Sequence, residues 1–558
     1  MSGVGRRGAL RFLAGALAVP AWANAQESDL VFPEAFGASA DGRTDDTHAI
    51  NAADLWCAEQ GRPLHFRGDY YVEGQLLHSD NVQWIGLGAT IWSGRTSVNP
   101  EKSQSATLRS RRSHPFVDFY RAFRSDATGL LPSDVARGCV LSGDLAFRWA
   151  PQALEFARRH GAATRMCMAY YLCHDFRIDD GVVFDCGYGD WTIAHWGDRF
   201  SGRRFRIEGG NQRPIYSDGF HSFGGDNGRI IGAEVSSGDD SFALANTFGQ
   251  RNRSWQFIDC AAYSRLASGF KLSVGRLGLT ATFPHAPSGR IEDIEIAGAR
   301  WMPVGPSRNG FFRVDTGGRN VPMRGGVIVS RAEDRTLVRN VTFDGTMDAR
   351  NEGLPRPVYP GEPLPGGMPA ISNAGGSNVR IRARVRNAAL WVAVNEGGED
   401  ISYDLDSPDP PNWTGTPGGI CAVECRPLYD SSEQGDRRRI IYRATRPRLN
   451  GSIRGGNRGL VRLVEVEETF ADQLRLHGIP DGFQGVDMSQ CDGPNSFTVS
   501  DYLELVSATG ATSSFGLKVT GQSRVAIRNL YAGNVHLIRG NPSPVLLRVD
   551  RRLSSPRS

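Results

Sequence analysis

The sequence lacks three features that often point to a function. No apolar run is long enough to span a bilayer, no CxxC pair or Cys/His cluster has zinc-binding spacing, and no long run of lysine and arginine is present. These absences weigh against a membrane-spanning protein, a structural zinc site and a nucleic-acid-binding surface. The net charge is +4, from 64 basic and 60 acidic residues, and this near balance gives nucleic-acid binding no further support.

Helical periodicity is also scarce after about residue 100, whereas glycine is abundant, with 67 residues. Many glycines suit short strands joined by tight turns, which is the pattern of an all-β fold. At 558 residues the chain is long for one compact domain, but a solenoid avoids that limit because it grows along one axis. We therefore expect an all-β solenoid.

The first 25 residues have the features of an export signal. Three arginines lie within the first eleven residues, an apolar run follows at 12–19, and the small residues Ala-Asn-Ala at 23–25 resemble a cleavage site. The adjacent Arg6 and Arg7 indicate twin-arginine export, with general secretion as the alternative. We expect the mature protein to be soluble and periplasmic or secreted.

Nine cysteines follow this segment, and an oxidising compartment would allow them to form disulfides. Cys421 and Cys425 are close enough in sequence to close a small loop. Because the number is odd, at least one thiol stays unpaired. Cys173 with His174 is an isolated pair, and we interpret it as structural.

The N-terminal part of the mature chain shows a helix followed by short strands. Thr44 or Asp45 is a suitable N-cap, and apolar residues then recur at helical spacing up to Trp56. The residues at 36–47 read Phe-Gly-Ala-Ser-Ala-Asp-Gly-Arg-Thr-Asp-Asp-Thr, and Gly-Asp-Tyr follows at 68–70.

This segment resembles the N-terminal segment of the pectate-lyase-like β-helix superfamily, whose members often begin Phe-Gly-Ala-x-Gly-Asp-Gly-x-Thr-Asp-Asp-Thr. Here Ala40 stands where glycine is usual. The resemblance implies a right-handed parallel β-helix whose open end is covered by a capping helix. We interpret Asp45 and Asp46 as residues that cap this helix rather than as part of a site.

The rest of the chain divides by composition. The stretch 97–165 is polar and contains a helical segment near 150–163, which predicts a partly helical insertion in the β-helix. We expect the regions to be an export signal (1–25), an N-terminal cap with the first coils (26–96), the insertion (97–165), the coils that carry the acidic motifs described next (166–350), a Pro/Gly-rich loop (351–376), and further coils or a small C-terminal β-region (377–558).

Three aspartates in two motifs are the strongest functional signal. Asp218 precedes a glycine, and the pair Asp239 and Asp240 begins 239 − 218 = 21 residues later, which is about one coil of a parallel β-helix. Residues one coil apart lie side by side at about 4.8 Å. The spacing therefore places three carboxylates on one wall. Cleavage of a glycosidic bond needs one carboxyl to protonate the leaving oxygen and another to activate water.

The residues around these motifs resemble the glycoside hydrolase family of polygalacturonases and rhamnogalacturonases. The family's Gly-Asp-Asp is intact at 238–240, and its Asn-Thr-Asp-Gly keeps the Asp-Gly at 218–219. Its Gly-His-Gly-x-Ser-Ile-Gly and Asn-Gly-Val-Arg-Ile-Lys-Thr motifs correspond to 269–275 and 309–316.

The resemblance implies a role for each aspartate. Asp239 would be the general acid, and Asp218 and Asp240 would hold and deprotonate the attacking water in an inverting mechanism. Like charges this close cannot all ionise freely, so at least one pKa rises, and a carboxyl with a raised pKa donates a proton near neutral pH. We expect no metal and no cofactor.

Two departures from the family motifs change the expected substrate. Phe270 replaces the family's histidine and Asp315 its lysine, whereas Arg313 is kept. In the family the arginine and the lysine bind the substrate carboxylate, so an aspartate there would repel a uronate. A neutral or differently charged sugar is therefore expected. Lys271 would restore a cation in the groove, and His221 would replace the lost histidine.

Aromatic side chains near these segments offer surfaces on which a sugar ring can stack. Half of them should point into the coil and belong to the core. The expected substrate-binding residues are His221, Lys271, Arg313, Tyr188, Trp196 and Tyr216. The expected partner is a poly- or oligosaccharide.

A polysaccharide lyase on the same fold is the first alternative. The acidic pairs at 179–180 and 239–240 would form a calcium-binding wall, and Lys271 or Arg313 would be the base. A lyase makes an unsaturated product that absorbs in the ultraviolet, whereas a hydrolase does not. The second alternative is a non-catalytic β-helix that binds glycans.

Overall fold

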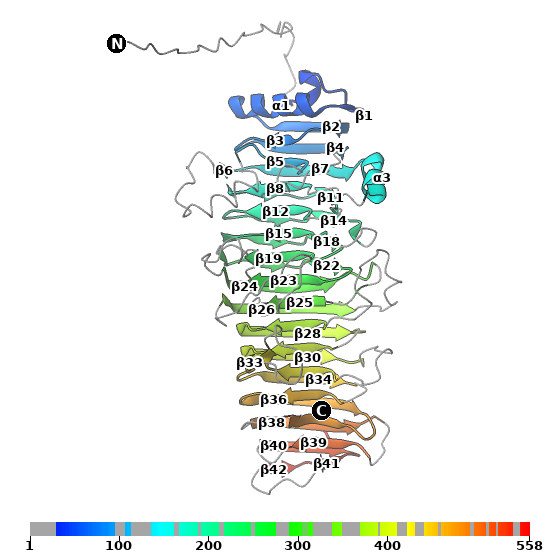
Figure 1. Ribbon diagram of the computed structural model, residues 1–558, viewed down its shortest axis with the longest axis vertical. Helices are drawn as coiled ribbons and strands as arrows, with labels where there is room; N and C mark the ends of the chain where they lie inside the picture. The colour runs from blue at the N-terminus through cyan, green and yellow to red at the C-terminus, as the bar shows by residue number, and fades with distance from the viewer. Residues whose placement is uncertain are drawn as a thin grey trace, which may run out of the picture.

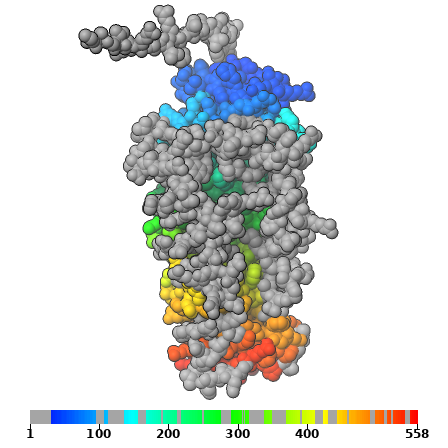
Figure 2. Space-filling view, viewed as in Figure 1, coloured from blue at the N-terminus to red at the C-terminus, as the bar shows by residue number. Residues whose placement is uncertain are grey.

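The protein is an elongated stack of coils with a helix across one end (Figure 1). The space-filling view shows the same body, which runs from the N-terminal cap to the last coils (Figure 2). The computed structural model describes residues 30–94, 106–112, 135–160, 167–187, 191–210, 217–246, 251–274, 289–304, 307, 310–315, 337–348, 369–388, 391–409, 421–429, 440–455, 459–490, 496–508, 513–519, 523–539 and 547–557.

One wall of the stack, which we call sheet B, has 15 parallel strands among the described residues, and they pair in chain order. They are β3 (Leu76–His78), β5 (Leu108–Ser110), β8 (Met168–Tyr171), β12 (Ile193–Trp196), β15 (Phe220–Ser222), β19 (Phe242–Asn246), β23 (Ser268–Val274), β25 (Gly310–Asp315), β27 (Ile371–Ala374), β29 (Ala393–Glu396), β31 (Val423–Arg426), β35 (Val461–Val464), β37 (Gln484–Gln490), β39 (Phe515–Val519) and β41 (His536–Arg539).

The remaining walls belong to sheet A, for which the described parts of the chain supply 23 strands, all paired in parallel. They are β1 (Asp41–Asp45), β2 (Leu64–Val72), β4 (Gln83–Ser93), β7 (Val140–Trp149), β10 (Arg177–Ile178), β11 (Val183–Asp185), β13 (Ser201–Arg203), β14 (Arg206–Glu208), β16 (Gly225–Asp226), β17 (Arg229–Ile231), β18 (Glu234–Ser237), β20 (Arg251–Arg253), β21 (Gln256–Ile258), β22 (Ala261–Ser264), β24 (Arg290–Trp301), β26 (Val338–Asp348), β28 (Ser377–Arg386), β30 (Glu399–Ser407), β34 (Arg448–Arg454), β36 (Thr469–Ile479), β38 (Ser496–Ser507), β40 (Arg524–Gly533) and β42 (Leu547–Arg552).

Among the described residues, two further sheets have two strands each. They pair β6 (Ala136–Arg137) with β9 (Cys173–His174) in parallel and β32 (Leu428–Tyr429) with β33 (Ile440–Tyr442) antiparallel. Because the chain alternates between sheet A and sheet B and each strand pairs with the equivalent strand of the next coil, the fold is a right-handed parallel β-helix. The fold class predicted from the sequence is confirmed.

Strand β28 shows how the sequence produces a coil. Val379, Ile381 and Val385 are buried in the interior, and arginines at alternate positions point outward. This period of two is the pattern of a strand with one buried face. The inward side chains of successive coils form one continuous core.

Corners between strands use residues that tolerate a left-handed backbone. Asp293, Asn340 and Asn378 have φ values of 59°, 57° and 50° and stack on successive coils. Asn378 Nδ2 donates to Asn340 Oδ1 at 2.9 Å, and Asn340 Nδ2 donates to Asp293 Oδ1 at 2.9 Å. Asp and Asn adopt this conformation more readily than most residues, so the ladder holds the corner in place.

The expected capping helix is α1 (Thr47–Gln60), which a short 3-10 helix, η1 (Pro33–Phe36), precedes. Its N-cap residue is Asp46, one or two positions after the predicted Thr44 or Asp45. The Asp46 carboxylate accepts the N–H groups of Ser39 and Ala40 rather than those of its own helix.

The stretch expected to be an insertion, 97–165, contributes strands to both sheets. Strand β5 pairs with β3 and β8, and β7 pairs with β4, β10 and β11. The helical segment is α3 (Pro151–His160), which follows β7 at the edge of the stack (Figure 1). The coils thus continue through this stretch. They also continue beyond 350, where β27 lies inside the range expected to be a loop and β28 to β42 extend the two sheets.

Cys421 and Cys425 do not close a disulfide loop, because both are buried free thiols. Burial raises the pKa of Cys425 to about 12, so this thiol stays protonated. Among the described residues no helix is both long and apolar enough to cross a membrane. The expected export signal and Cys491 lie outside the described residues.

Candidate active site

Two adjacent coils bring the three aspartates together at the start of strands in sheet B. Asp218 lies two residues before β15, and Asp240 lies two residues before β19. The strands pair in register, with Phe220 opposite Phe242, and Gly219 N donates to the Asp240 carbonyl at 2.8 Å. As a result, carboxylate oxygens of Asp218, Asp239 and Asp240 all lie within 4.8 Å of one another.

Asp218 is held firmly and is 8% exposed. Its Oδ1 accepts the Asp240 backbone N–H at 3.1 Å. Its Oδ2 lies 2.8 Å from His221 Nδ1, three residues along the chain. His221 therefore fixes the orientation of this carboxylate.

Asp240 is held more tightly still and is 1% exposed. Its Oδ1 accepts the Ser268 backbone N–H at 3.1 Å, and its Oδ2 lies 2.5 Å from Lys271 Nζ. A buried carboxylate is stable only when it is paired and hydrogen-bonded, and these two contacts provide both conditions. Asp240 therefore lies in a buried ion pair with Lys271.

Asp239 differs from its neighbours because it is half-buried and its carboxyl makes no hydrogen bond with another described residue. Burial, followed by the charges of Asp240 and Asp218, raises the pKa of Asp239 well above its usual range, while Lys271 and Arg313 oppose the rise. A carboxyl that is hard to ionise is suited to donate a proton.

A column of outward positions on sheet B carries the cations. His221, Ala243, Lys271 and Arg313 lie opposite one another on β15, β19, β23 and β25. Burial alone would lower the pKa of Lys271, but the charges of Asp240 and Asp239 outweigh it and raise the pKa, so the amine is protonated. Two cations therefore face three carboxyl groups.

Phe270, which replaces the family's histidine, points inward. It lies opposite Phe242 and Phe312 in the core, with its ring 5.0 Å from that of Phe242. The outward residue of β23 nearest the aspartates is Lys271. Asp315 lies at the end of β25 opposite Ser273, and its side chain lies outside the described set.

Aromatic side chains flank the aspartates on the outer face of sheet B. Trp196, at the end of β12, packs in a small cluster separate from the main core, together with Tyr171, Trp191 and Phe223. The ring centroid of His221 lies 4.3 Å from that of Phe223 and 5.4 Å from that of Trp191.

Of the expected aromatic groove residues, the structure places Trp196 in this cluster, and Tyr188 and Tyr216 lie outside the described residues. Trp191 and Phe223 were missing from the predicted substrate-binding set. The period of two along β15 gives the signal for Phe223, because it puts residue 223 on the same side as His221.

The calcium-binding wall of the lyase alternative is not formed. Asp179 pairs with Arg177, and Asp180 pairs with Arg203 and Arg204. Within the described part of the chain, Asp218, Asp239 and Asp240 are the one group of three or more carboxylates, histidines or cysteines close enough to share a metal ion.

No protein-family model matches the chain, and no curated protein matches it in sequence. Solved structures do match, at low identity. They include a mannuronan C-5 epimerase A-module of Azotobacter vinelandii (13% identity, 94% of this chain and 100% of that chain, TM-score 0.40) and a family 28 exopolygalacturonase of Yersinia enterocolitica (11% identity, 71% and 77%, TM-score 0.39). A surface adhesin of Streptococcus pneumoniae also matches (11% identity, 80% and 90%, TM-score 0.43). The parallel β-helix fold of this chain follows from the strand pairing described above.

Proposed function

We propose that this protein is a carbohydrate-active enzyme that hydrolyses glycosidic bonds of a poly- or oligosaccharide. One observation carries the proposal. Asp239 is a half-buried carboxyl with a raised pKa and no described hydrogen-bond partner, and it lies beside two carboxylates that are locked in place. This is the asymmetry that glycoside hydrolysis needs between a proton donor and a carboxylate.

In the proposed reaction, Asp239 gives its proton to the glycosidic oxygen as the bond to the anomeric carbon breaks. Asp218, oriented by His221, accepts a proton from the water that attacks the anomeric carbon. Asp240 contributes charge next to the water and keeps Lys271 in the site. The released sugar takes the hydroxyl of the water, and the enzyme regains its proton on Asp239 through solvent.

We propose inversion at the anomeric carbon, because two anchored carboxylates can share one water. Carboxyl groups usually stand about 6.5–9.5 Å apart in inverting enzymes and about 5–5.5 Å apart in retaining ones. Here one oxygen of each carboxylate lies within 4.8 Å of the others, which is closer than either class usually shows, and we propose that the water sits beside the carboxylates rather than between them. Proton NMR of the first product tests this step, and a retained anomer would contradict it.

The substrate we propose is not a galacturonan. Lys271 is already paired with Asp240, so its charge is not available to attract a substrate carboxylate. The aromatic cluster of Trp191, Trp196 and Phe223 instead offers an apolar surface next to His221, where a neutral sugar ring can stack.

A lyase reaction is the second candidate, and the geometry disfavours it. A lyase base must be unprotonated, whereas Lys271 is ion-paired and its pKa is raised. The deciding experiment incubates the purified protein with a panel of polysaccharides and measures both reducing ends and ultraviolet absorbance. New reducing ends without absorbance support the hydrolase, and absorbance that EDTA abolishes supports the lyase.

We also propose that the protein is exported after removal of residues 1–25. The basic start, the apolar run at 12–19 and the small residues at 23–25 support this proposal. N-terminal sequencing of the protein recovered from the periplasm or the medium tests it, and a mature chain that begins at Met1 would contradict it.

A further inference from the structure

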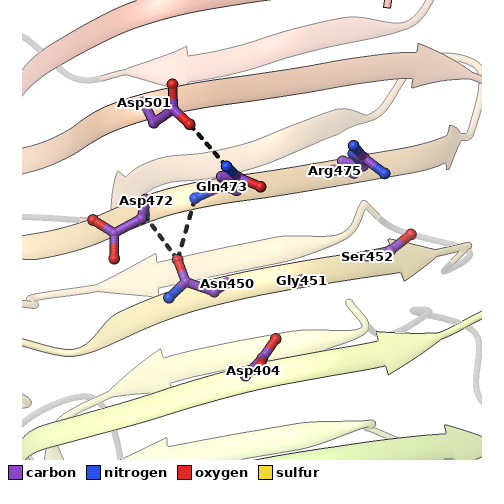
Figure 3. Close-up of a pocket in the computed structure, with 8 residues that line it drawn as sticks. All are labelled: Asp404, Asn450, Gly451, Ser452, Asp472, Gln473, Arg475 and Asp501. Atoms are coloured by element: carbon purple, nitrogen blue, oxygen red, sulfur yellow. Dashed lines mark hydrogen bonds between the residues drawn. The ribbon is translucent and has the colours of Figure 1, made fainter. Parts of the chain in front are cut away.

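A hollow lies on the outer face of sheet A, away from the aspartates of sheet B. It spans the outer face of four neighbouring strands, β30, β34, β36 and β38, and has a volume of about 440 Å³ (Figure 3). Strand β35 of sheet B follows β34 in the chain and so marks the level of the hollow in the stack. It lies six strand steps from β19, beside the aspartates. At about 4.8 Å per step, the hollow is roughly 30 Å along the stack from the aspartates. The residues that line it are Asp404, Asn450, Gly451, Ser452, Asp472, Gln473, Arg475 and Asp501.

Irregular strand pairing creates the hollow. The register shifts between Arg448 and Gly451 on β34, between Ala471 and Gln473 on β36, and between Val499 and Tyr502 on β38. Shifts of this kind are β-bulges, which redirect side chains and are common beside functional sites.

Gly451 keeps the floor of the hollow open. Its φ is +102°, and a Cβ atom at this position would lie 2.1 Å from the Leu405 carbonyl oxygen. Only glycine therefore fits here, and the strand backbone itself forms the bottom of the hollow.

Hydrogen bonds hold the walls in place. Asn450 Oδ1 accepts the backbone N–H groups of Asp472 at 2.8 Å and Gln473 at 3.4 Å, and Gln473 Nε2 donates to Asp501 Oδ2 at 2.8 Å (Figure 3). A preformed polar surface binds a ligand without a large ordering cost.

The charges of the hollow disfavour an anionic ligand and a metal ion. A hydrogen bond from Ser500, followed by other contacts that include an ion pair with Arg448, lowers the pKa of Asp472, and a hydrogen bond from Gln473 lowers the pKa of Asp501. Both are therefore carboxylates, and each is paired with an arginine, Arg448 or Arg557, so the walls carry little net charge to attract an anion. Among the described residues these aspartates do not come close enough together to form a metal-binding group.

We propose that this hollow binds a neutral stretch of polysaccharide without cleaving it. Carboxylates, carboxamides, a hydroxyl and a guanidinium alternate along its walls, and a sugar hydroxyl both donates and accepts hydrogen bonds. Its four strands cover about 14 Å along the stack, which suits a short run of sugar units. This inference goes beyond the proposed hydrolysis and does not require it.

Affinity electrophoresis of the full chain tests the inference, with the Asp239→Asn variant used so that no polysaccharide is cleaved. The gels contain dextran, galactan, mannan or xylan as neutral probes, or polygalacturonate as an acidic one. The variants are Ser452→Trp, which fills the hollow, and Gln473→Ala, which removes one wall contact. The control is Thr346→Trp, an exposed outward position on β26 of the same sheet.

We expect at least one neutral polysaccharide to retard the protein, and both hollow variants to bind it roughly tenfold more weakly while the control binds normally. No retardation by any neutral probe, or equal retardation of all variants, would overturn the inference. Retardation lost in Trp196→Ala but kept in Ser452→Trp would also overturn it, because binding would then occur beside the aspartates.

The alternative ligand is a calcium ion, and titration calorimetry with calcium chloride tests it. Calcium binding that is lost in Asp404→Asn would assign the hollow to a cation and overturn the inference. Thermal unfolding shows which variants are folded. If Ser452→Trp does not fold, the binding measured with Gln473→Ala decides the test.

Discussion

Lys271 Nζ lies 2.5 Å from Asp240 Oδ2, and 2% of the Asp240 side chain is exposed. The two residues come from neighbouring strand regions of sheet B and meet because β19 and β23 pair in register. The contact keeps a charged carboxylate in a buried position next to the proposed proton donor.

Replacement of Lys271 by methionine should destabilise the fold by about 3 kcal/mol, because Asp240 would then be a buried charge without its partner. Urea unfolding at pH 7 measures the loss. Lys518→Met is the matched control. Lys518 occupies the equivalent outward position in sheet B and lies 3.7 Å from Asp487, but its side chain is 35% exposed. We expect that control to cost less than about 1 kcal/mol. Equal losses in the two variants would contradict a special role for the buried pair.

The raised pKa of Asp239 predicts a stability effect with a defined sign. Below the unfolded-state pKa of about 4, Asp239 is neutral in both states and the Asp239→Asn variant should match the wild type. As the pH rises towards the folded-state pKa, the unfolded chain ionises first, so the wild type loses stability that the variant keeps. The variant should gain about 1.4 kcal/mol for each unit by which the folded pKa is raised. Thermal unfolding from pH 3 to pH 8 measures the difference. A gain that is independent of pH would show that Asp239 is not hard to ionise.

His221 should act through the orientation of Asp218 rather than through the core. His221→Ala should lower kcat by about tenfold or more, because the bond to Asp218 Oδ2 is lost. His221→Asn can place an amide donor near the position of Nδ1, and it should recover part of the rate. If both variants keep the wild-type kcat and lose only stability, the histidine is structural.

Trp196 should contribute to binding more than to chemistry. Trp196→Ala removes an outward aromatic ring from the cluster beside His221. We expect a KM several-fold higher with little change in kcat, because stacking holds the ground state and the transition state alike. A fall in kcat at unchanged KM would place Trp196 in the chemical step.

The sequence predicts the architecture and the meeting of the aspartates because both depend on local spacing. One coil separates Asp218 from Asp239, so their proximity follows from the period of the fold alone. The capping helix follows in the same way from apolar residues at helical spacing.

The contacts of the site could not be predicted, because they depend on strand register across loops of unequal length. His221, Ala243, Lys271 and Arg313 face one another in the structure, yet they are separated by 22, 28 and 42 residues. The sequence also did not predict that β5 and β7 belong to the coils. Polar segments and α3 lie next to these strands and interrupt the strand pattern. The exposure of each aspartate follows from these contacts, so the difference between buried Asp240 and half-buried Asp239 is a property of the folded chain.

The role of Asp239 as the proton donor is tested by the activity of Asp239→Asn. The substitution is nearly isosteric and removes the proton that the carboxyl would donate. The control is Asp487→Asn, another aspartate on sheet B, which should keep full activity. On whichever polysaccharide the wild type cleaves, we expect Asp239→Asn to release reducing ends at least about a hundredfold more slowly, with an unchanged circular dichroism spectrum. A rate within a few-fold of the wild type would contradict it.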